Sequence, residues 1–98
     1  MLTFEDLNSA YPVKYLLENI GLRKVEEREN YFRFSSPFKE DKNPSMVLYK
    51  KNLMCIDFSS NYTKSFFTFV KDITGDSLFN VAGLDKEKIN SKMFENSL

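Results

Sequence analysis

The absence of histidine is the feature that most constrains how this chain of 98 residues can fold. A structural zinc site needs four nitrogen or sulfur ligands in a tetrahedron, and Cys55 is the only cysteine in the sequence. A single cysteine also excludes an internal disulfide and is typical of a reducing compartment. We therefore expect no metal or other cofactor, and a fold stabilised by packed side chains, for which ten Phe and five Tyr provide apolar surface.

Length and charge leave the class of partner open. A chain of this size forms one domain with a modest core. Its 14 Lys and Arg balance its 14 Asp and Glu, so the net charge neither favours nor excludes a nucleic-acid partner. The segment 36–64 is mildly basic, with five lysines (Lys39, Lys42, Lys50, Lys51, Lys64) against three acids (Glu40, Asp41, Asp57). The N-terminus does not resemble a signal peptide, and no apolar run approaches the roughly 18 residues of a membrane span. We expect a soluble cytoplasmic protein without a membrane partner.

Two short helices are predicted at the N-terminal end. Thr3 and Asp6 have the spacing of a helix-capping pair, and this first helix should end within 8–10. A second helix should begin with Pro12 at its first position and end at Gly21. Its apolar residues recur at i, i+3, i+4 and i+7, which is typical of an amphipathic helix: Val13, Leu16, Leu17 and Ile20.

Short aromatic and aliphatic runs in the middle of the chain predict antiparallel strands. Phe32 and Phe34 should share one face of a strand over 31–34. The runs 46–49 and 53–58 should pair as a hairpin through the turn 50–52. The remaining segments are 22–29, either a first strand or an exposed lead-in, and 59–63, a polar turn.

The C-terminal part is predicted to be helical. Ser65 should begin a helix over 66–73, although the high β propensity of this segment also allows a strand. A stop at 74–76 should precede a last short helix capped by Asp76 or Ser77. The sequence thus predicts an α+β domain over 1–84, with three to five strands in a small antiparallel ribbon-like sheet and helices at both ends. The segment 85–98 reads as a charged tail or linker, either weakly helical or mobile.

Several short motifs occur in an order that resembles a known family. They are Ser36-Pro37-Phe38-Lys39, Asn43-Pro44-Ser45-Met46, Phe67-Thr68-Phe69-Val70 and Gly75-Asp76-Ser77-Leu78. Over about 13–82 this order is similar to the N-terminal zinc ribbon of bacterial and phage DnaG-type DNA primases. That family carries Cys-Pro-Phe-His, Thr-Pro-Ser-Phe and a hairpin with Cys-x-x-Cys at the corresponding places.

The zinc ligands of that family are not conserved in this chain. Ser36 and Lys39 stand at the Cys and His positions, and the Cys-x-x-Cys pair corresponds to Ile56 and Ser59. A different gap placement aligns it with Cys55 and Phe58 instead. The resemblance therefore implies a metal-free relative of the primase zinc ribbon.

A lost zinc ion must be replaced by other interactions, because it contributes about 10–16 kcal/mol in small zinc-finger peptides. A few buried aromatic rings recover much of this at about 25 cal/mol per Å² of apolar area. Phe58, Phe66 and Phe67 are the candidates near the former site. The alternative is that these three are ordinary core residues.

The resemblance implies a module that binds the single-stranded DNA template during phage or plasmid DNA replication. Exposed aromatic rings would stack on bases and cations would neutralise phosphates. The candidate residues are Arg33, Lys39, Lys42, Tyr49, Lys50, Lys51, Tyr62 and Lys64. The alternative for these residues is an ordinary solvated face.

A second hypothesis is a module that docks on a replication or transcription protein. Catalysis by the chain alone is disfavoured, because no nucleophile has an evident base and the three glycines form no phosphate-binding loop. Cys55, between Met54 and Ile56, should be a buried small apolar residue. The chain would then be the N-terminal part of a primase or an accessory to one.

Overall fold

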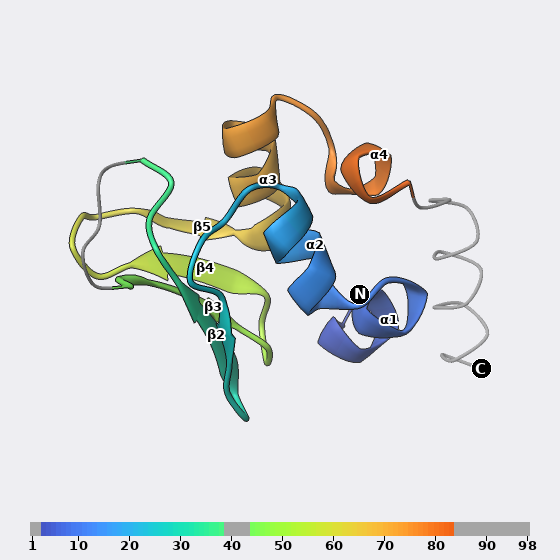
Figure 1. Cartoon of the computed structure of the whole chain (residues 1–98), viewed down its shortest axis with the longest axis horizontal. Helices are drawn as coiled ribbons and strands as arrows, with labels where there is room; N and C mark the ends of the chain where they lie inside the picture. The colour runs from blue at the N-terminus through green and yellow to red at the C-terminus, as the bar shows by residue number, and fades with distance from the viewer. Residues whose placement is uncertain (1–2, 39–43, 84–98) are drawn as a thin grey trace.

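The structure, a computed structural model, describes residues 3–38 and 44–83. It confirms the α+β class: two helices precede a five-stranded antiparallel sheet and two helices follow it (Figure 1). The elements are α1 (Phe4–Ala10), α2 (Val13–Asn19), β1 (Glu26–Glu27), β2 (Tyr31–Phe34), β3 (Met46–Tyr49), β4 (Met54–Asp57), β5 (Thr63–Ser65), α3 (Phe66–Thr74) and α4 (Leu78–Ala82). The segment 85–98 lies outside the described residues.

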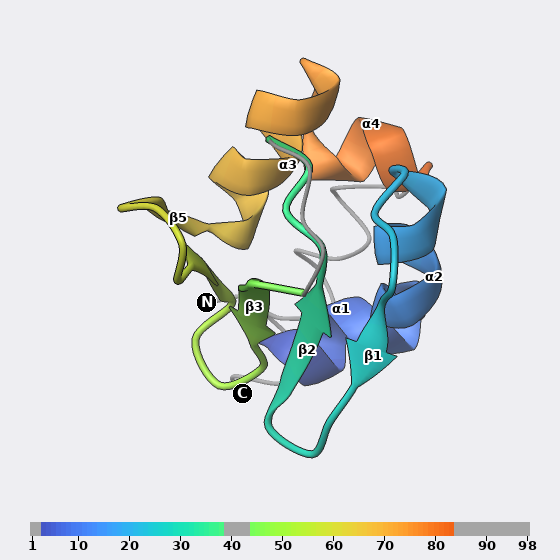
Figure 2. The same cartoon turned by 60° about the vertical axis from the view of Figure 1, so that its left-hand side comes forward.

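The sheet is a meander in which each strand pairs with the next one along the chain. In the register, Phe32 lies opposite Leu48, and Leu48 opposite Cys55. All three are buried, and the described helices lie on their side of the sheet (Figures 1 and 2). Because side chains alternate between the two faces of a strand, the neighbours of these residues point to the opposite face.

The N-terminal helices form as the sequence predicts. Thr3 and Asp6 make a reciprocal capping box, with each side chain bonded to the backbone of the other residue. Gly21 has a φ of 95°, which a residue with a side chain rarely adopts, and it follows the last turn of α2. One detail differs: Pro12 is the cap that precedes α2, and Val13 is its first helical residue.

The C-terminal segment is helical despite its β propensity, because tertiary burial and capping favour the helix. Ser65 caps α3 by accepting the backbone N–H of Thr68. Phe66, Phe69 and Val70 are buried along one side of α3. Of the two predicted caps of α4, Ser77 is the one that accepts a backbone N–H of that helix.

An aromatic cluster connects α3 to the end of the sheet. Phe69 is fully buried, with ring centroids 5.8 Å from Phe34 and 6.1 Å from both Phe38 and Tyr62. The rings of Phe38 and Tyr62 are 5.0 Å apart. We call these four residues the aromatic cluster. Phe34 and Phe38 flank Ser36 in the sequence, and Tyr62 follows Ser59. The cluster therefore holds these two parts of the chain together.

The expected packing of Phe58 is wrong, while Phe66 is buried as expected. The side chain of Phe58 is 66% exposed, since it follows β4 and points away from the helices. Phe67 is half-buried and stacks on Phe79 of α4 at 6.1 Å. The rings that link the segments around Ser36 and Ser59 are those of the aromatic cluster, and Phe58, Phe66 and Phe67 are not among them.

Two strands differ from the sequence-based expectation. The segment 22–29 contains a strand, but β1 has only two residues. Part of the predicted turn 59–63 belongs to β5, an edge strand with a polar Thr-Lys-Ser sequence. In the part of the chain that is described, no helix is both long and apolar enough to cross a membrane.

Candidate nucleic-acid interface

The sheet has a second face that the described helices do not cover. On this face Tyr49 lies between Tyr31 of β2 and Met54 of β4. In the adjacent row of paired residues, Val47 lies between Arg33 and Ile56. Val47 is buried, and the other five are partly exposed. Aromatic rings and an arginine therefore occupy a surface that a ligand can reach.

A groove of about 520 Å³ runs over this face. Tyr31, Arg33, Val47 and Tyr49 form its floor, and Phe58 lies at one end beside Pro44, Ser45 and Ser59. The rings of Tyr31 and Tyr49 meet edge to face, with centroids 6.2 Å apart. We call this hollow the sheet-face groove. Its three aromatic side chains suit flat apolar ligand groups.

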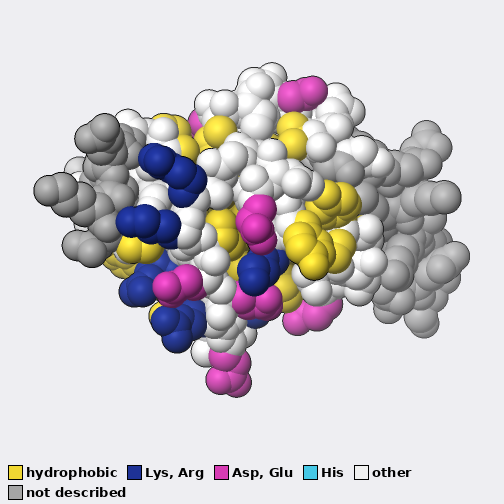
Figure 3. Space-filling view, in the orientation of Figure 1, with side chains coloured by type: hydrophobic (Ala, Val, Ile, Leu, Met, Phe, Trp, Pro, Cys, Tyr) yellow, Lys and Arg dark blue, Asp and Glu magenta, His cyan; other side chains and the backbone are white. Residues whose placement is uncertain are grey.

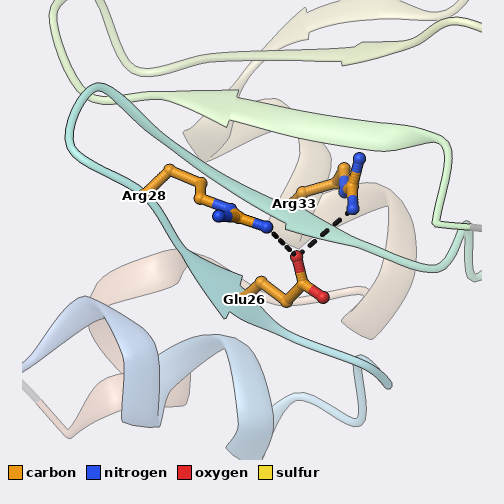
Figure 4. A network of polar contacts seen from close by, with 3 residues as sticks. All are labelled: Glu26, Arg28 and Arg33. Carbon is orange, nitrogen blue, oxygen red and sulfur yellow. Dashed lines mark hydrogen bonds and ion pairs between the residues drawn. The ribbon is translucent and has the colours of Figure 1, made fainter.

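Three charged residues form a network at the β1 side of this face (Figure 4). Glu26 Oε2 accepts from Arg28 Nη2 at 3.1 Å and from Arg33 Nη2 at 3.3 Å. The Arg33 Nε is shielded from solvent and has no hydrogen-bond partner among the described residues. The guanidinium of Arg33 is thus held at the groove by a single carboxylate oxygen.

Of the predicted binding residues, Arg33 and Tyr49 lie together in the sheet-face groove. Lys50 lies on the other side of the sheet. Its Nζ contacts Glu27 Oε2 at 2.9 Å and lies 5.2 and 5.1 Å from the ring centroids of Phe4 and Phe32. The side chain is only 17% exposed. Lys50 therefore packs between Glu27 and the rings of Phe4 and Phe32, on the face of the sheet that carries the core.

Tyr62 is also turned toward the helices. Its hydroxyl donates to Asp72 Oδ2 at 2.6 Å, and its ring belongs to the aromatic cluster. Burial, followed by the hydrogen bond and negative charge of Asp72, raises the pKa of Tyr62. This tyrosine therefore fastens α3 to the sheet and does not join the groove.

Of the remaining predicted lysines, Lys51 and Lys64 are described, and neither lines the sheet-face groove. Lys51 lines a separate hollow of about 670 Å³ with Glu5 and Glu29, whose charges oppose a phosphate. Lys64 is exposed on the edge strand β5. Lys39 and Lys42 lie outside the described residues. On the face drawn in Figure 3, Lys and Arg side chains nevertheless gather over the strand side, with acidic side chains among them.

A buried carboxylate lies between Ser36 and Ser59, two of the positions that the sequence resemblance aligns with zinc ligands. Asp57 is 2% exposed, and its Oδ1 accepts from Ser59 N at 2.9 Å and Ser45 Oγ at 3.1 Å. The hydroxyls of Ser59 and Ser36 also bond to this carboxylate. Burial alone would raise the pKa of Asp57, but the hydrogen bonds from Ser59, Ser36 and Ser45 together lower it.

The four positions aligned with the family's ligands are thus only partly brought together. Ser36 and Ser59 meet at Asp57. Ile56 points to the opposite face of β4, next to Val47, and Lys39 lies outside the described residues. Among the residues that the structure describes, no group of three or more His, Cys, Asp or Glu side chains is arranged to hold a metal ion.

Cys55 is buried in β4, as its apolar neighbours predict, and burial raises the pKa of its thiol. We expect the folded protein to resist a thiol-specific chromogenic disulfide reagent at neutral pH, because the reactive thiolate is scarce and shielded. The full thiol signal should develop after unfolding in guanidinium chloride. Rapid labelling of the folded protein would contradict this burial.

No family model matches the sequence, and no curated protein matches it. The geometry of the described residues therefore carries the functional argument.

Sequence reasoning missed four residues at this surface: Tyr31, Phe58, Glu26 and Arg28. Strand alternation contains the signal for Tyr31, because Phe32 and Phe34 on the core face put Tyr31 and Arg33 on the other face. The position of Phe58 just after β4 and the convergence of Arg28 on Glu26 depend on the tertiary structure, so no local pattern indicates them.

Proposed function

We propose that this chain binds single-stranded DNA in the sheet-face groove, as a metal-free relative of the primase zinc ribbon that holds template in phage or plasmid DNA replication. The observation that carries the proposal is the groove itself, with three aromatic side chains and Arg33 on the uncovered face. In this proposal the chain is not catalytic on its own, and a separate polymerising domain extends the primer.

The chemistry of the groove suits unpaired bases. Every base has a flat π face, so stacking on Tyr31, Tyr49 or Phe58 tolerates different sequences. A cation beside the rings neutralises the phosphate that connects two stacked bases, and Arg33 occupies such a place in the groove. Ser36 and Ser59, two of the positions aligned with the family's zinc ligands, meet at one carboxylate.

Phe58→Ala should weaken single-stranded DNA binding by about 5-fold to 150-fold, the effect of losing one base–aromatic stack of about 1–3 kcal/mol. The measurement is fluorescence anisotropy with a labelled oligothymidylate of about 12 nucleotides, within the usual range of site sizes, at low and moderate salt. Wild-type affinity should fall steeply as salt rises.

Tyr15→Ala is the matched control for this variant. Tyr15 lies on α2, far from the groove lining, and its side chain is 61% exposed compared with 66% for Phe58. Truncation of either exposed ring should change the free energy of unfolding by no more than about 0.5 kcal/mol. Equal effects of the two variants on DNA affinity would count against the groove as the binding site.

A second candidate function is docking on a replication or transcription protein. The exposed ring of Phe58 beside an apolar groove favours it, because aromatic anchors dominate many protein interfaces. Wild-type protein that fails to bind the oligonucleotide at low salt would exclude the DNA proposal. Capture of a replication or transcription protein by wild-type chain, and its loss with Phe58→Ala, would then support docking.

A further inference from the structure

The carboxylate of Glu26 occupies a place that suits one oxygen of a phosphate. Two guanidinium groups, from Arg28 in the β1–β2 turn and Arg33 in β2, direct Nη2 atoms at the same oxygen, Glu26 Oε2 (Figure 4). Convergent arginines of this kind are typical of phosphate recognition.

We propose that Arg28 and Arg33 form a phosphodiester subsite on the β1 side of the sheet-face groove, and that Glu26 holds the subsite closed until a nucleic-acid strand displaces it. The inference rests on the proposed function and specifies where the strand's backbone lies. A base stacked in the groove would place its phosphate toward Arg33, which lines the groove and belongs to the network.

The exchange is energetically accessible because all three side chains reach solvent. The exposed fractions are 56% for Arg28, 41% for Arg33 and 45% for Glu26. Ion pairs at such exposure contribute little, so breaking two of them opposes binding only weakly. A phosphodiester restores both contacts with the same charge. Glu26 therefore competes with the ligand and lowers its affinity modestly.

The test compares Glu26→Gln with Glu27→Gln. The two glutamates are adjacent in β1, with exposed fractions of 45% and 46%. Each substitution removes one negative charge, but Glu27 pairs with Lys50 and not with the two arginines. This pair separates local competition from a change in net charge.

Glu26→Gln should tighten binding of the labelled oligothymidylate by about 2-fold to 30-fold, the range set by two exposed ion pairs. Glu27→Gln should change the affinity by less than about 2-fold, since its charge acts only through screened solvent. Equal effects of the two substitutions would overturn the inference and leave the proposed function standing.

Two further experiments test whether the group that Arg28 and Arg33 contact is a phosphate. The gain from Glu26→Gln should disappear in an Arg33→Gln background, with circular dichroism used to verify folding of each variant. It should persist on an abasic deoxyribose-phosphate strand, on which Phe58→Ala should have no effect. A gain that survives Arg33→Gln, or that requires bases, would overturn the subsite. Absence of binding by both wild type and Glu26→Gln at low salt would instead reject the proposed function itself.

Discussion

Phe69→Ala should lower the free energy of unfolding by roughly 3–5 kcal/mol, the usual effect of removing a buried aromatic ring. Phe69 is fully buried and is the one member of the aromatic cluster with ring contacts to the other three. Its loss leaves a cavity between α3 and the sheet. Domains of this size are stable by only about 5–15 kcal/mol, so the melting temperature should fall steeply.

Chemical denaturation monitored by circular dichroism measures this effect, with Phe58→Ala as the control for a lost exposed ring. Phe69→Leu is the second variant, since it fills part of the cavity and should retain a folded state if Phe69→Ala does not. A change below about 1 kcal/mol for Phe69→Ala would show that the cluster does not connect α3 to the sheet.

Asp57→Ala should destabilise the fold by about 3 kcal/mol, because hydrogen bonds to a charged group contribute more than neutral ones. The substitution leaves the hydroxyls of Ser36, Ser45 and Ser59 without their shared acceptor. Ser45→Ala removes one donor and keeps the carboxylate, so it should destabilise by about 1 kcal/mol. Equal losses in the two variants would mean that the carboxylate does not organise this end of the sheet.

The contribution of Asp57 should depend on pH. Its pKa is lower in the folded protein than in the unfolded chain, where aspartate titrates near 3.9. The ionised carboxylate therefore stabilises the fold above that pH, and the stabilisation disappears as the pH falls through the lower, folded-state pKa. Unfolding curves of wild type and Asp57→Asn should thus differ most near neutrality and converge below about pH 4. A constant difference across this range would assign the effect to shape and not to charge.

The elements with strong local signals could be predicted from the sequence. The capping residues Thr3 and Ser65 set the starts of α1 and α3 through hydrogen bonds within one turn. The apolar period of α2 and the alternation in β2 also depend on near neighbours only. No local signal predicts β5, because Thr63, Lys64 and Ser65 are all polar and show no alternation of apolar and polar residues. The strand forms through its backbone pairing with β4.

The candidate site could be predicted only in part, for a similar reason. Strand alternation places Arg33 and Tyr49 on the open face, and both were predicted to bind nucleic acid. Charge alone predicts a role for the neighbouring lysines, but the side chain of Lys50 lies on the core face against Glu27, Phe4 and Phe32. No local pattern indicates the role of Asp57, because Ser36 and Ser45 are distant from it in the chain and meet it only in the folded structure.

Both outer strands of the sheet are short and charged. β1 consists of Glu26 and Glu27, and β5 has Lys64 at its centre. An extended chain that paired with either edge would find few free backbone groups and would have to bury the charged side chains beside them. Short, charged edge strands of this kind prevent edge-to-edge association in natural sheets. We therefore expect little fibril formation along the sheet edges, even though the described helices leave one aromatic face of the sheet uncovered.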